Sequence, residues 1–431
     1  MIAHNLGYPR TGSHRELIKA CEQFWAQKIT AQQLQETGQQ IRQANWLTQQ
    51  QAGIALIPCN DFSFYDQVLD MSLTVGAIPE RFHPLLHRPG SLQADLAQTE
   101  ASQLDLYFAM ARGYQQDGLV LDAMPVAKWF DTNYRYVVPE FSANQSFSLL
   151  SETIFAEFDE AQRTLTETPK PVLLGPVSYL LLGKENEAGF DRLDLLHRLL
   201  PVYEQILTRL QGQGAKWVQF DEPCLANDLT PKQQKAFITA YNRLSEQFPL
   251  LKFLLASYFE GYGSNLDLAI KLPVDALHLD LVHCPNQLDD LLQTDFVYQK
   301  TQLSLGVVDG RNIWINDMGR SLATIEHAVL ALGMDRILIA PSCSLVHVPS
   351  DLQSEANEPA LSPDINQWLA FARQKLDEVA NLTTLFLEPD DCGAMAALLA
   401  NKRAFDARWQ SSLMNRPAEY TRLSQLTRQD A

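Results

Sequence analysis

Short apolar runs recur along the chain, and most of them end in polar or charged residues. One run starts at Ile2, another starts at Ile54, and six more follow Pro169 at regular intervals. The eight predicted strands lie near residues 2–6, 54–59, 171–177, 215–221, 251–258, 275–281, 302–308 and 336–342. Helical segments separate them, and eight strands alternating with helices are the number that closes a (β/α)8 TIM barrel. The pattern therefore predicts an α/β fold of this class.

Two parts of the chain fall outside this rhythm. Residues 67–168 carry helical stretches and an aromatic segment at 129–136, so we expect a large helical and hairpin excursion between strands two and three. The sequence predicts that the barrel consists of residues 1–389. Residues 390–431 are expected to form a helical extension packed on or beside it. Ser13 and Glu16 have the spacing of a capping box, which predicts a helix from about His14. The Gln-rich segment 30–51 predicts one or two more helices.

Composition limits the class of partner. The chain has 431 residues, is 46% hydrophobic and carries a net charge of −17. Nucleic-acid binding needs a concentrated positive surface, so this charge argues against a nucleic-acid partner. Six scattered cysteines without a CxxC pair, no visible signal peptide and no long apolar run predict a cytoplasmic protein with no membrane partner.

Carboxylates stand at the ends of two predicted strands, where a barrel of this class has its active site. Asp221 and Glu222 end the run that starts at Trp217, and Asp280 ends the run that starts at Leu277. These three acids are the candidate catalytic residues, alone or with a metal. The alternative interpretation is structural, with the carboxylates bonded to nearby backbone groups. The residues alone leave both interpretations open.

Five cations belong to segments that we expect on the mouth side of the barrel: Arg10, Arg15, Lys19, Lys128 and Arg135. Arg15 and Lys19 are four residues apart, so both would project from one face of a helix. A helix start with arginine nearby suits a small carboxylate-rich ligand. The alternative is that these are solvated charges or partners of the surplus Asp and Glu.

Several segments, taken in order, resemble a known family. They are 15–17 (REL), 128–134 (KWFDTNY), 220–223 (FDEP), 258–261 (YFEG), 277–283 (LHLDLVH) and 342–345 (SCSL). From residue 6 to about residue 380 the chain is similar to the N-terminal half of cobalamin-independent methionine synthase. The resemblance implies a place in methionine biosynthesis. The family's two-barrel methyltransferase moves a methyl group from 5-methyltetrahydropteroyltriglutamate to homocysteine through a zinc-bound thiolate.

The resemblance also implies a folate-binding set. In the family, zinc and homocysteine belong to the C-terminal barrel, and the N-terminal barrel contributes basic contacts to the polyglutamate tail of the folate. The matching positions are Arg15, Glu16, Leu17, Ile18, Lys19 and Lys128. Ile18 stands where the family motif has lysine, and Lys19 follows it directly.

The zinc ligands of the family's C-terminal barrel would fall, by strand order, on Leu255, Ser257, Asp280 and Cys343. A leucine cannot coordinate zinc, and an aspartate and a cysteine alone leave the ion too exposed for tight binding. The resemblance therefore predicts no tightly bound cofactor in this chain and disfavours zinc, with folate as the substrate or ligand.

Three functions follow from these features. The first is a methionine-synthase-related protein that binds the folate or another carboxylate-rich molecule and acts with a separate catalytic-domain chain, or has diverged to a related task. The second is an autonomous barrel enzyme that uses the mouth carboxylates. The third is a ligand-binding or regulatory module without turnover.

Overall fold

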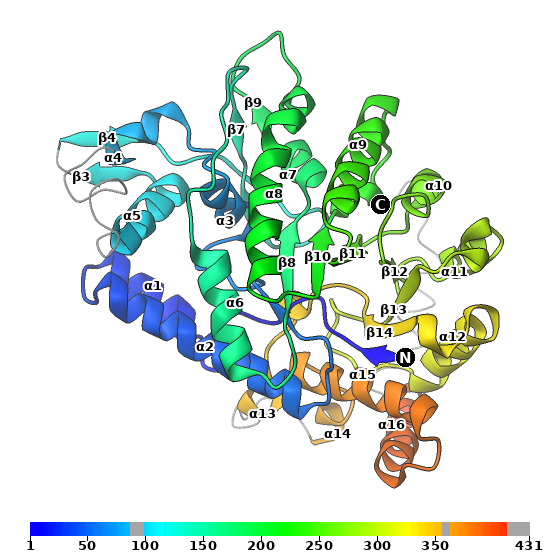
Figure 1. Cartoon of the computed structure of the whole chain (residues 1–431). Helices are drawn as coiled ribbons and strands as arrows, with labels where there is room; N and C mark the ends of the chain where they lie inside the picture. The colour runs from blue at the N-terminus through cyan, green and yellow to red at the C-terminus, as the bar shows by residue number, and fades with distance from the viewer. Residues whose placement is uncertain (87–98, 117, 356–362, 412–431) are drawn as a thin grey trace, which may run out of the picture.

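The computed structural model describes residues 1–86, 99–116, 118–355 and 363–411. Its centre is a sheet of eight parallel strands in the order β1-β14-β13-β12-β11-β10-β8-β2 (Figure 1). The strands are β1 (Ile2–Ala3), β2 (Pro58–Cys59), β8 (Lys170–Leu174), β10 (Trp217–Asp221), β11 (Lys252–Ala256), β12 (Ala276–Asp280), β13 (Gln302–Val308) and β14 (Ile337–Pro341). A parallel bridge between His4 and Leu56 joins the two ends of this order. The (β/α)8 barrel is confirmed, with a strand at each of the eight predicted positions.

Helices surround the barrel because the strands place apolar side chains on its outer face and each helix has an apolar side to cover them. The helices after β8 include α7 (Pro176–Leu182), α8 (Leu196–Gly212), α9 (Pro231–Gln247), α10 (Leu266–Ala269), α11 (Gln287–Leu292), α12 (Met318–Leu332) and α15 (Ala372–Leu387). In α8 the buried residues Leu199, Tyr203, Ile206 and Leu210 recur every three or four positions. That spacing places them on the single face that packs against the barrel core.

The N-terminal helices begin at residues that the sequence predicts only in part. Helix α1 (Glu16–Trp25) starts after Arg15, which takes a left-handed conformation with φ of 62°, so the prediction of a Ser13 cap is wrong. The Glu16 carboxylate instead accepts a hydrogen bond from the His14 N–H at 2.9 Å. The Gln-rich segment forms one helix, α2 (Ala31–Gln51), because Thr30 and Gln33 make a reciprocal capping box at its start.

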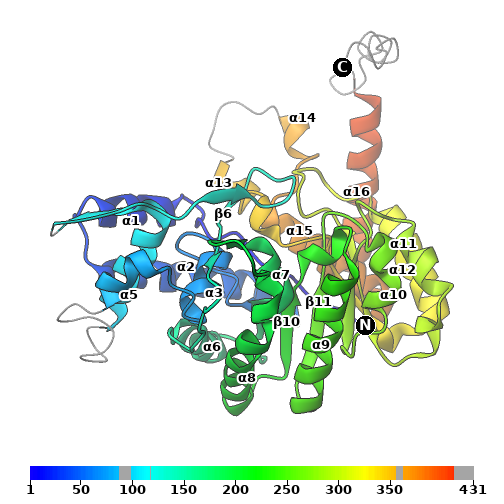
Figure 2. The ribbon, with the colours of Figure 1, turned by 90° about the horizontal axis from the view of Figure 1, so that it is seen from above.

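The expected excursion between strands two and three is present. It packs with α1 and α2 around a second hydrophobic cluster, which includes Leu34 of α2 and Phe82 and Phe108 of the excursion. Its elements are α3 (Gln67–Thr74), α4 (His83–Leu86), α5 (Thr99–Arg112), α6 (Thr153–Thr164) and the strands β3 (Tyr114–Gln116), β4 (Leu119–Leu121), β5 (Val126–Lys128), β6 (Arg135–Val137) and β7 (Glu140–Phe141). Two hairpins pair β3 with β4 and β5 with β6, and β7 pairs with β9 (Lys184–Glu185). Figure 2 shows α1 and α5 projecting to one side of the barrel.

After β14 come α13 (Leu352–Glu355), α14 (Pro363–Asn366), α15 and α16 (Cys392–Gln410). Helix α15 packs on β14 and β1, and α16 packs on α12 and α15 at the outside of the barrel. The division into a barrel at 1–389 and an extension at 390–431 stays a prediction, and residues 412–431 lie outside the described part. Within the described ranges, no helix combines the length and apolar character needed to cross a bilayer.

Candidate binding site

Hydrogen bonds between buried polar side chains fill the barrel interior. Lys170, at the start of β8, donates to the Gln219 side-chain carbonyl at 2.5 Å and to the Asn5 main-chain carbonyl at 2.9 Å. Its Nζ also lies 3.3 Å from Nδ1 of His4. All three neighbours are uncharged acceptors, and burial lowers the pKa of Lys170 to about 7. This lysine acts as a structural group within the core.

Asp221 ends β10 and extends this network toward the mouth. Gln219 Nε2 donates to Asp221 Oδ1 at 2.7 Å, and the Tyr258 hydroxyl donates to Oδ2 at 3.0 Å. Burial raises the pKa of Asp221 to about 6. The space left at this point of the mouth is about 20 Å³, which is room for about one water molecule. Asp221 is therefore at the mouth, as predicted, but no folate-sized molecule fits over it in this conformation.

Glu222, directly after β10, faces the surrounding helices and accepts hydrogen bonds from the first turn of α7 and from α9. Its carboxylate accepts from the Ser178 N–H at 2.7 Å, the Val177 N–H at 3.3 Å and the Tyr241 hydroxyl at 3.0 Å. A Cβ on Gly175 would lie 2.1 Å from this carboxyl group, so the glycine after β8 is required by the contact. Glu222 is fully buried and its oxygens are occupied, which is the structural interpretation of this acid.

Asp280 ties together the loops that follow β11 and β12. One carboxylate oxygen accepts from the Val282 and His283 N–H groups at 3.1 and 3.0 Å. The other accepts from the Phe259 N–H at 3.0 Å and contacts Nδ1 of His283 at 2.8 Å. Phe259 has a φ of 78°, so this bond helps to hold a conformation that non-glycine residues rarely adopt. The roles of Asp221, Glu222 and Asp280 in catalysis stay predictions, but each has a clear structural task.

The β5–β6 hairpin covers the barrel mouth, which the sequence did not indicate. The Tyr134 ring lies 6.0 Å from His347, and the Phe130 ring lies 6.0 Å from Phe259. Asp131 forms an ion pair of 3.1 Å with Arg311, which follows β13. These contacts come from the loops after β11, β13 and β14, so the hairpin tip bridges three strand ends. Burial under this cover lowers the pKa of His347 to about 4.

Arg10 is one of the five cations considered from the sequence, and it packs against the β5–β6 hairpin. Its guanidinium group lies 5.0 Å from the centre of the Tyr134 ring and donates to the main-chain carbonyl of Ser63 at 3.2 Å. Arg10 is therefore engaged within the protein. It is a poorer candidate for an external anion than the remaining four cations.

The residues that the resemblance assigns to folate binding separate into exposed and packed groups. Arg15 and Lys19 are exposed at the first turn of α1, and Lys128 is exposed at the end of β5. Leu17 is buried in the second hydrophobic cluster and therefore serves packing. Glu16 and Ile18 are half-buried. Among the described residues, no ion pair or side-chain hydrogen bond engages Arg15, Lys19 or Lys128.

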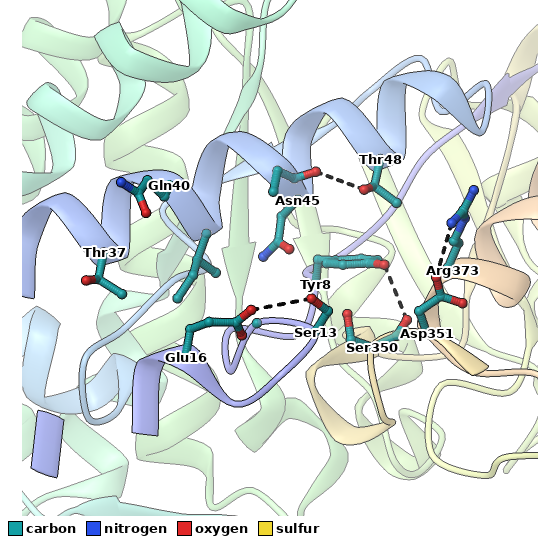
Figure 3. Close-up of a pocket in the computed structure, with 13 residues that line it drawn as sticks. Tyr8, Ser13, Glu16, Thr37, Gln40, Asn45, Thr48, Ser350, Asp351 and Arg373 are labelled. Atoms are coloured by element: carbon teal, nitrogen blue, oxygen red, sulfur yellow. Dashed lines mark hydrogen bonds and ion pairs between the residues drawn. The ribbon is translucent and has the colours of Figure 1, made fainter. Parts of the chain in front are cut away.

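A cavity of about 240 Å³ lies beside the start of α1, between the loop after β1, helix α2, the segment at 350–351 and the start of α15 (Figure 3). Its lining residues are Tyr8, Gly12, Ser13, Glu16, Thr37, Gln40, Ile41, Ala44, Asn45, Thr48, Ser350, Asp351 and Arg373. Glu16 is the member of the predicted folate-binding set that faces it. Tyr8 donates to the Ser350 carbonyl at 3.4 Å, and Arg373 pairs with Asp351 at 3.1 Å. These polar groups of the cavity wall therefore already have partners within the protein.

Sequence comparison decides the family. Residues 2–332 match the model of the N-terminal domain of cobalamin-independent synthase. The chain belongs to this family. The resemblance carried by the short motifs is thereby confirmed, and the cobalamin-independent synthase N-terminal domain accounts for the barrel and its excursion.

Curated relatives extend the match to nearly the whole chain. A 5-methyltetrahydropteroyltriglutamate–homocysteine methyltransferase of Cytophaga hutchinsonii is 55% identical over 416 residues, which are 96% of this chain and 52% of the relative. One of Flavobacterium johnsoniae is 56% identical over 89% of this chain and 48% of the relative. One of Xylella fastidiosa is 47% identical over 99% of this chain and 53% of the relative. The chain thus spans about half the length of the curated relatives it matches.

Solved structures support the fold alone. A putative vitamin-B12-independent methionine synthase from Listeria monocytogenes aligns with a TM-score of 0.56 and 13% identity, over 90% of this chain and 99% of that one. A B12-independent methionine synthase from Shewanella sp. W3-18-1 aligns with a TM-score of 0.57 and 13% identity, over 90% and 97% of the two chains. Both agree with the barrel described above.

The residues at the four positions aligned with zinc ligands do not fit zinc. Leu255 is fully buried and has no ligand atom, and Ser257 has a neutral hydroxyl. Asp280 already accepts four hydrogen bonds, and the buried Cys343 thiol contacts the Ser344 carbonyl at 3.6 Å while burial raises its pKa. A zinc site takes Cys thiolates, His imidazoles or carboxylates whose lone pairs are free for the metal. Within the described residues, no group of three or more His, Cys, Asp or Glu gathers around a point where an ion would sit.

Proposed function

We propose that this chain binds the polyglutamate tail of 5-methyltetrahydropteroyltriglutamate and takes part in methyl transfer from that folate to homocysteine. The proposal places the chain in methionine biosynthesis. It assigns to this barrel the recognition of the folate tail, through Arg15, Lys19 and Lys128. The names and the 47–56% identity of the curated relatives support the reaction, and the exposed cations support the division of labour.

The observation that carries the proposal is a set of cations without partners in an acidic protein. The chain has 51 Asp and Glu against 34 Lys and Arg, so partners of opposite charge are abundant. Arg42, Arg81, Arg192, Arg209 and Arg243 are examples that do form ion pairs. Arg15, Lys19 and Lys128 stay exposed and unpaired within the described part of the chain. Free cations that can reach solvent suit a flexible chain of carboxylates.

The mouth geometry supports recognition in preference to chemistry. Asp221, Glu222 and Asp280 are each engaged by donors of the protein itself, and the β5–β6 hairpin covers the mouth. In the proposal, zinc and homocysteine are held by a methionine synthase catalytic barrel on a separate chain. The folate acts as the shared ligand, with its tail on this chain.

A binding experiment tests the assignment. We propose titrating the parent, Arg15→Ala and Lys128→Ala with the monoglutamate and triglutamate forms of 5-methyltetrahydrofolate. Each substitution should weaken the triglutamate complex by about 1.5–3 kcal/mol and the monoglutamate complex by less, because each removes a charge-assisted contact to the tail. Lys216→Ala is the matched control, since Lys216 is exposed directly before β10 at the opposite end of the barrel. Equal losses for the two ligands would show that the tail is held elsewhere.

The partner is tested separately. Adding this chain to a purified catalytic barrel should increase methyl transfer from the triglutamate folate, and Lys128→Ala should reduce the gain. An absence of complex formation together with an absence of any gain would contradict the proposed partnership while leaving the binding result intact.

A further inference from the structure

Lys128 and Arg135 lie directly opposite each other in the β5–β6 hairpin. They are a register pair of the antiparallel ladder, and both side chains are exposed. Directly opposed residues point to the same face of a hairpin, with Cβ atoms about 4.5–5.5 Å apart. We propose that Arg135 and Lys128 together form a clamp for one carboxylate of the glutamate tail. This inference rests on the proposed function and adds Arg135, which the family resemblance does not assign.

The two positive charges of Lys128 and Arg135 repel each other, and the acid of the hairpin turn does not neutralise them. Opposed like charges destabilise a hairpin, whereas an opposite-charge pair would stabilise it. The acid of the turn, Asp131, is directed to Arg311 in the loop after β13. Among the described residues, Lys128 and Arg135 make no ion pair. An external anion between the two side chains removes the repulsion and gains two charge-assisted contacts.

The hairpin is held rigidly enough to present the pair. Trp129 follows Lys128 and is 1% exposed, and its N–H donates to the Tyr134 carbonyl at 2.8 Å. Thr132 closes the turn with a 2.7 Å bond to the Trp129 carbonyl. At the other end of β6, the Val137 N–H donates to Asp66 at 3.0 Å. Because both ends are fixed, little backbone entropy is lost when an anion binds.

The two cations have complementary chemistry. The planar guanidinium group of Arg135 can bind both oxygens of a carboxylate, whereas the Lys128 ammonium acts as a point charge beside it. A γ-linked glutamate tail offers one free carboxylate at each residue and a further one at its end. A monoglutamate folate offers fewer such groups, so the clamp should contribute mainly to the longer ligand.

Titration of Arg135 variants tests the clamp. Arg135→Gln should weaken triglutamate binding by about 5- to 10-fold at low salt and leave monoglutamate binding unchanged. Arg135→Lys, which keeps the charge but loses the fork, should show a smaller loss. Arg163→Gln is the matched control, because Arg163 is exposed near the end of α6, at the opposite end of the barrel. The melting temperature without ligand should rise in Arg135→Gln and stay constant in the control, because only the first removes the repulsion.

The outcomes separate this inference from the proposed function. If Lys128→Ala and Arg15→Ala weaken triglutamate binding and Arg135→Gln does not, the clamp is wrong and the tail site stands. If none of the three changes the preference for the triglutamate, the proposed function fails together with the clamp. A lower melting temperature of Arg135→Gln without ligand would show that Arg135 has a partner inside the protein, and would also overturn the clamp.

Discussion

The Tyr258 hydroxyl donates a 3.0 Å hydrogen bond to Asp221 and thereby joins the end of β10 to the loop after β11. Both side chains are buried at the barrel mouth. An acid at this position is a catalytic candidate in most barrels of this class. Here the acid is bonded to its own protein, and the mouth has room for about one water molecule.

Tyr258→Phe should lower the free energy of unfolding by about 1–3 kcal/mol, because it leaves one oxygen of the buried Asp221 without a donor. Urea denaturation measures this loss. Tyr298→Phe is the control, since Tyr298 is 86% exposed and should change the stability by no more than about 0.5 kcal/mol. Equal stabilities of the two variants would contradict the structural role of the bond.

Glu222→Ala should be destabilising as well, by at least about 1–3 kcal/mol, because it leaves the Val177 and Ser178 N–H groups and the Tyr241 hydroxyl without their acceptor. Glu246, exposed on α9, offers a matched control as Glu246→Ala. If Glu222 served an external ligand instead, its removal would change binding without this loss of stability, and chemical denaturation would detect the difference.

The eight strands were predictable because each is a buried apolar run, and burial on both faces leaves a continuous signal in the sequence. The start of α1 was not predictable in the same way. Ser13 and Glu16 have the right spacing for a cap, but the left-handed conformation of Arg15 turns the chain first. A backbone choice of this kind leaves no trace in a pattern of apolar and polar residues.

The candidate site was predictable by location only. Asp221 and Asp280 do end barrel strands, yet apart from Gln219 their donors come from residues 258 and 259 and from the loop at 282–283. The cover formed by the β5–β6 hairpin depends on contacts such as Asp131 with Arg311, which are 180 residues apart. Sequence spacing reports which side chains are near a strand end, but it cannot report what occupies their hydrogen bonds.

Lys170 predicts a specific dependence of stability on pH. Its pKa is about 7 in the folded protein, mainly because of burial, and about 10.4 in an unfolded chain. Between these values the unfolded state holds more protons, so this group makes the folded state more stable as the pH rises. The unfolding free energy of the parent minus that of Lys170→Met should therefore increase from pH 7 to pH 9, by up to about 1.4 kcal/mol per unit. A constant or falling difference would mean that Lys170 stays charged in the core.

Zinc should not stabilise this chain. The positions of Leu255, Ser257, Asp280 and Cys343 do not form a ligand set, so dialysis against a chelator should leave the melting temperature unchanged. A zinc ion that binds the folded state should stabilise it by about 2.7 kcal/mol at 100 times its dissociation constant. Such a shift, with stoichiometric zinc in the purified protein, would contradict the expectation.

The most direct test of tail recognition is the ratio of two dissociation constants on the unaltered chain, for the monoglutamate and triglutamate forms of 5-methyltetrahydrofolate. We predict that the triglutamate binds at least about 10-fold more tightly at low salt, which corresponds to one charge-assisted contact of about 1.4 kcal/mol or more. The ratio should decrease as salt screens the exposed cations. Equal constants at low salt would contradict the account.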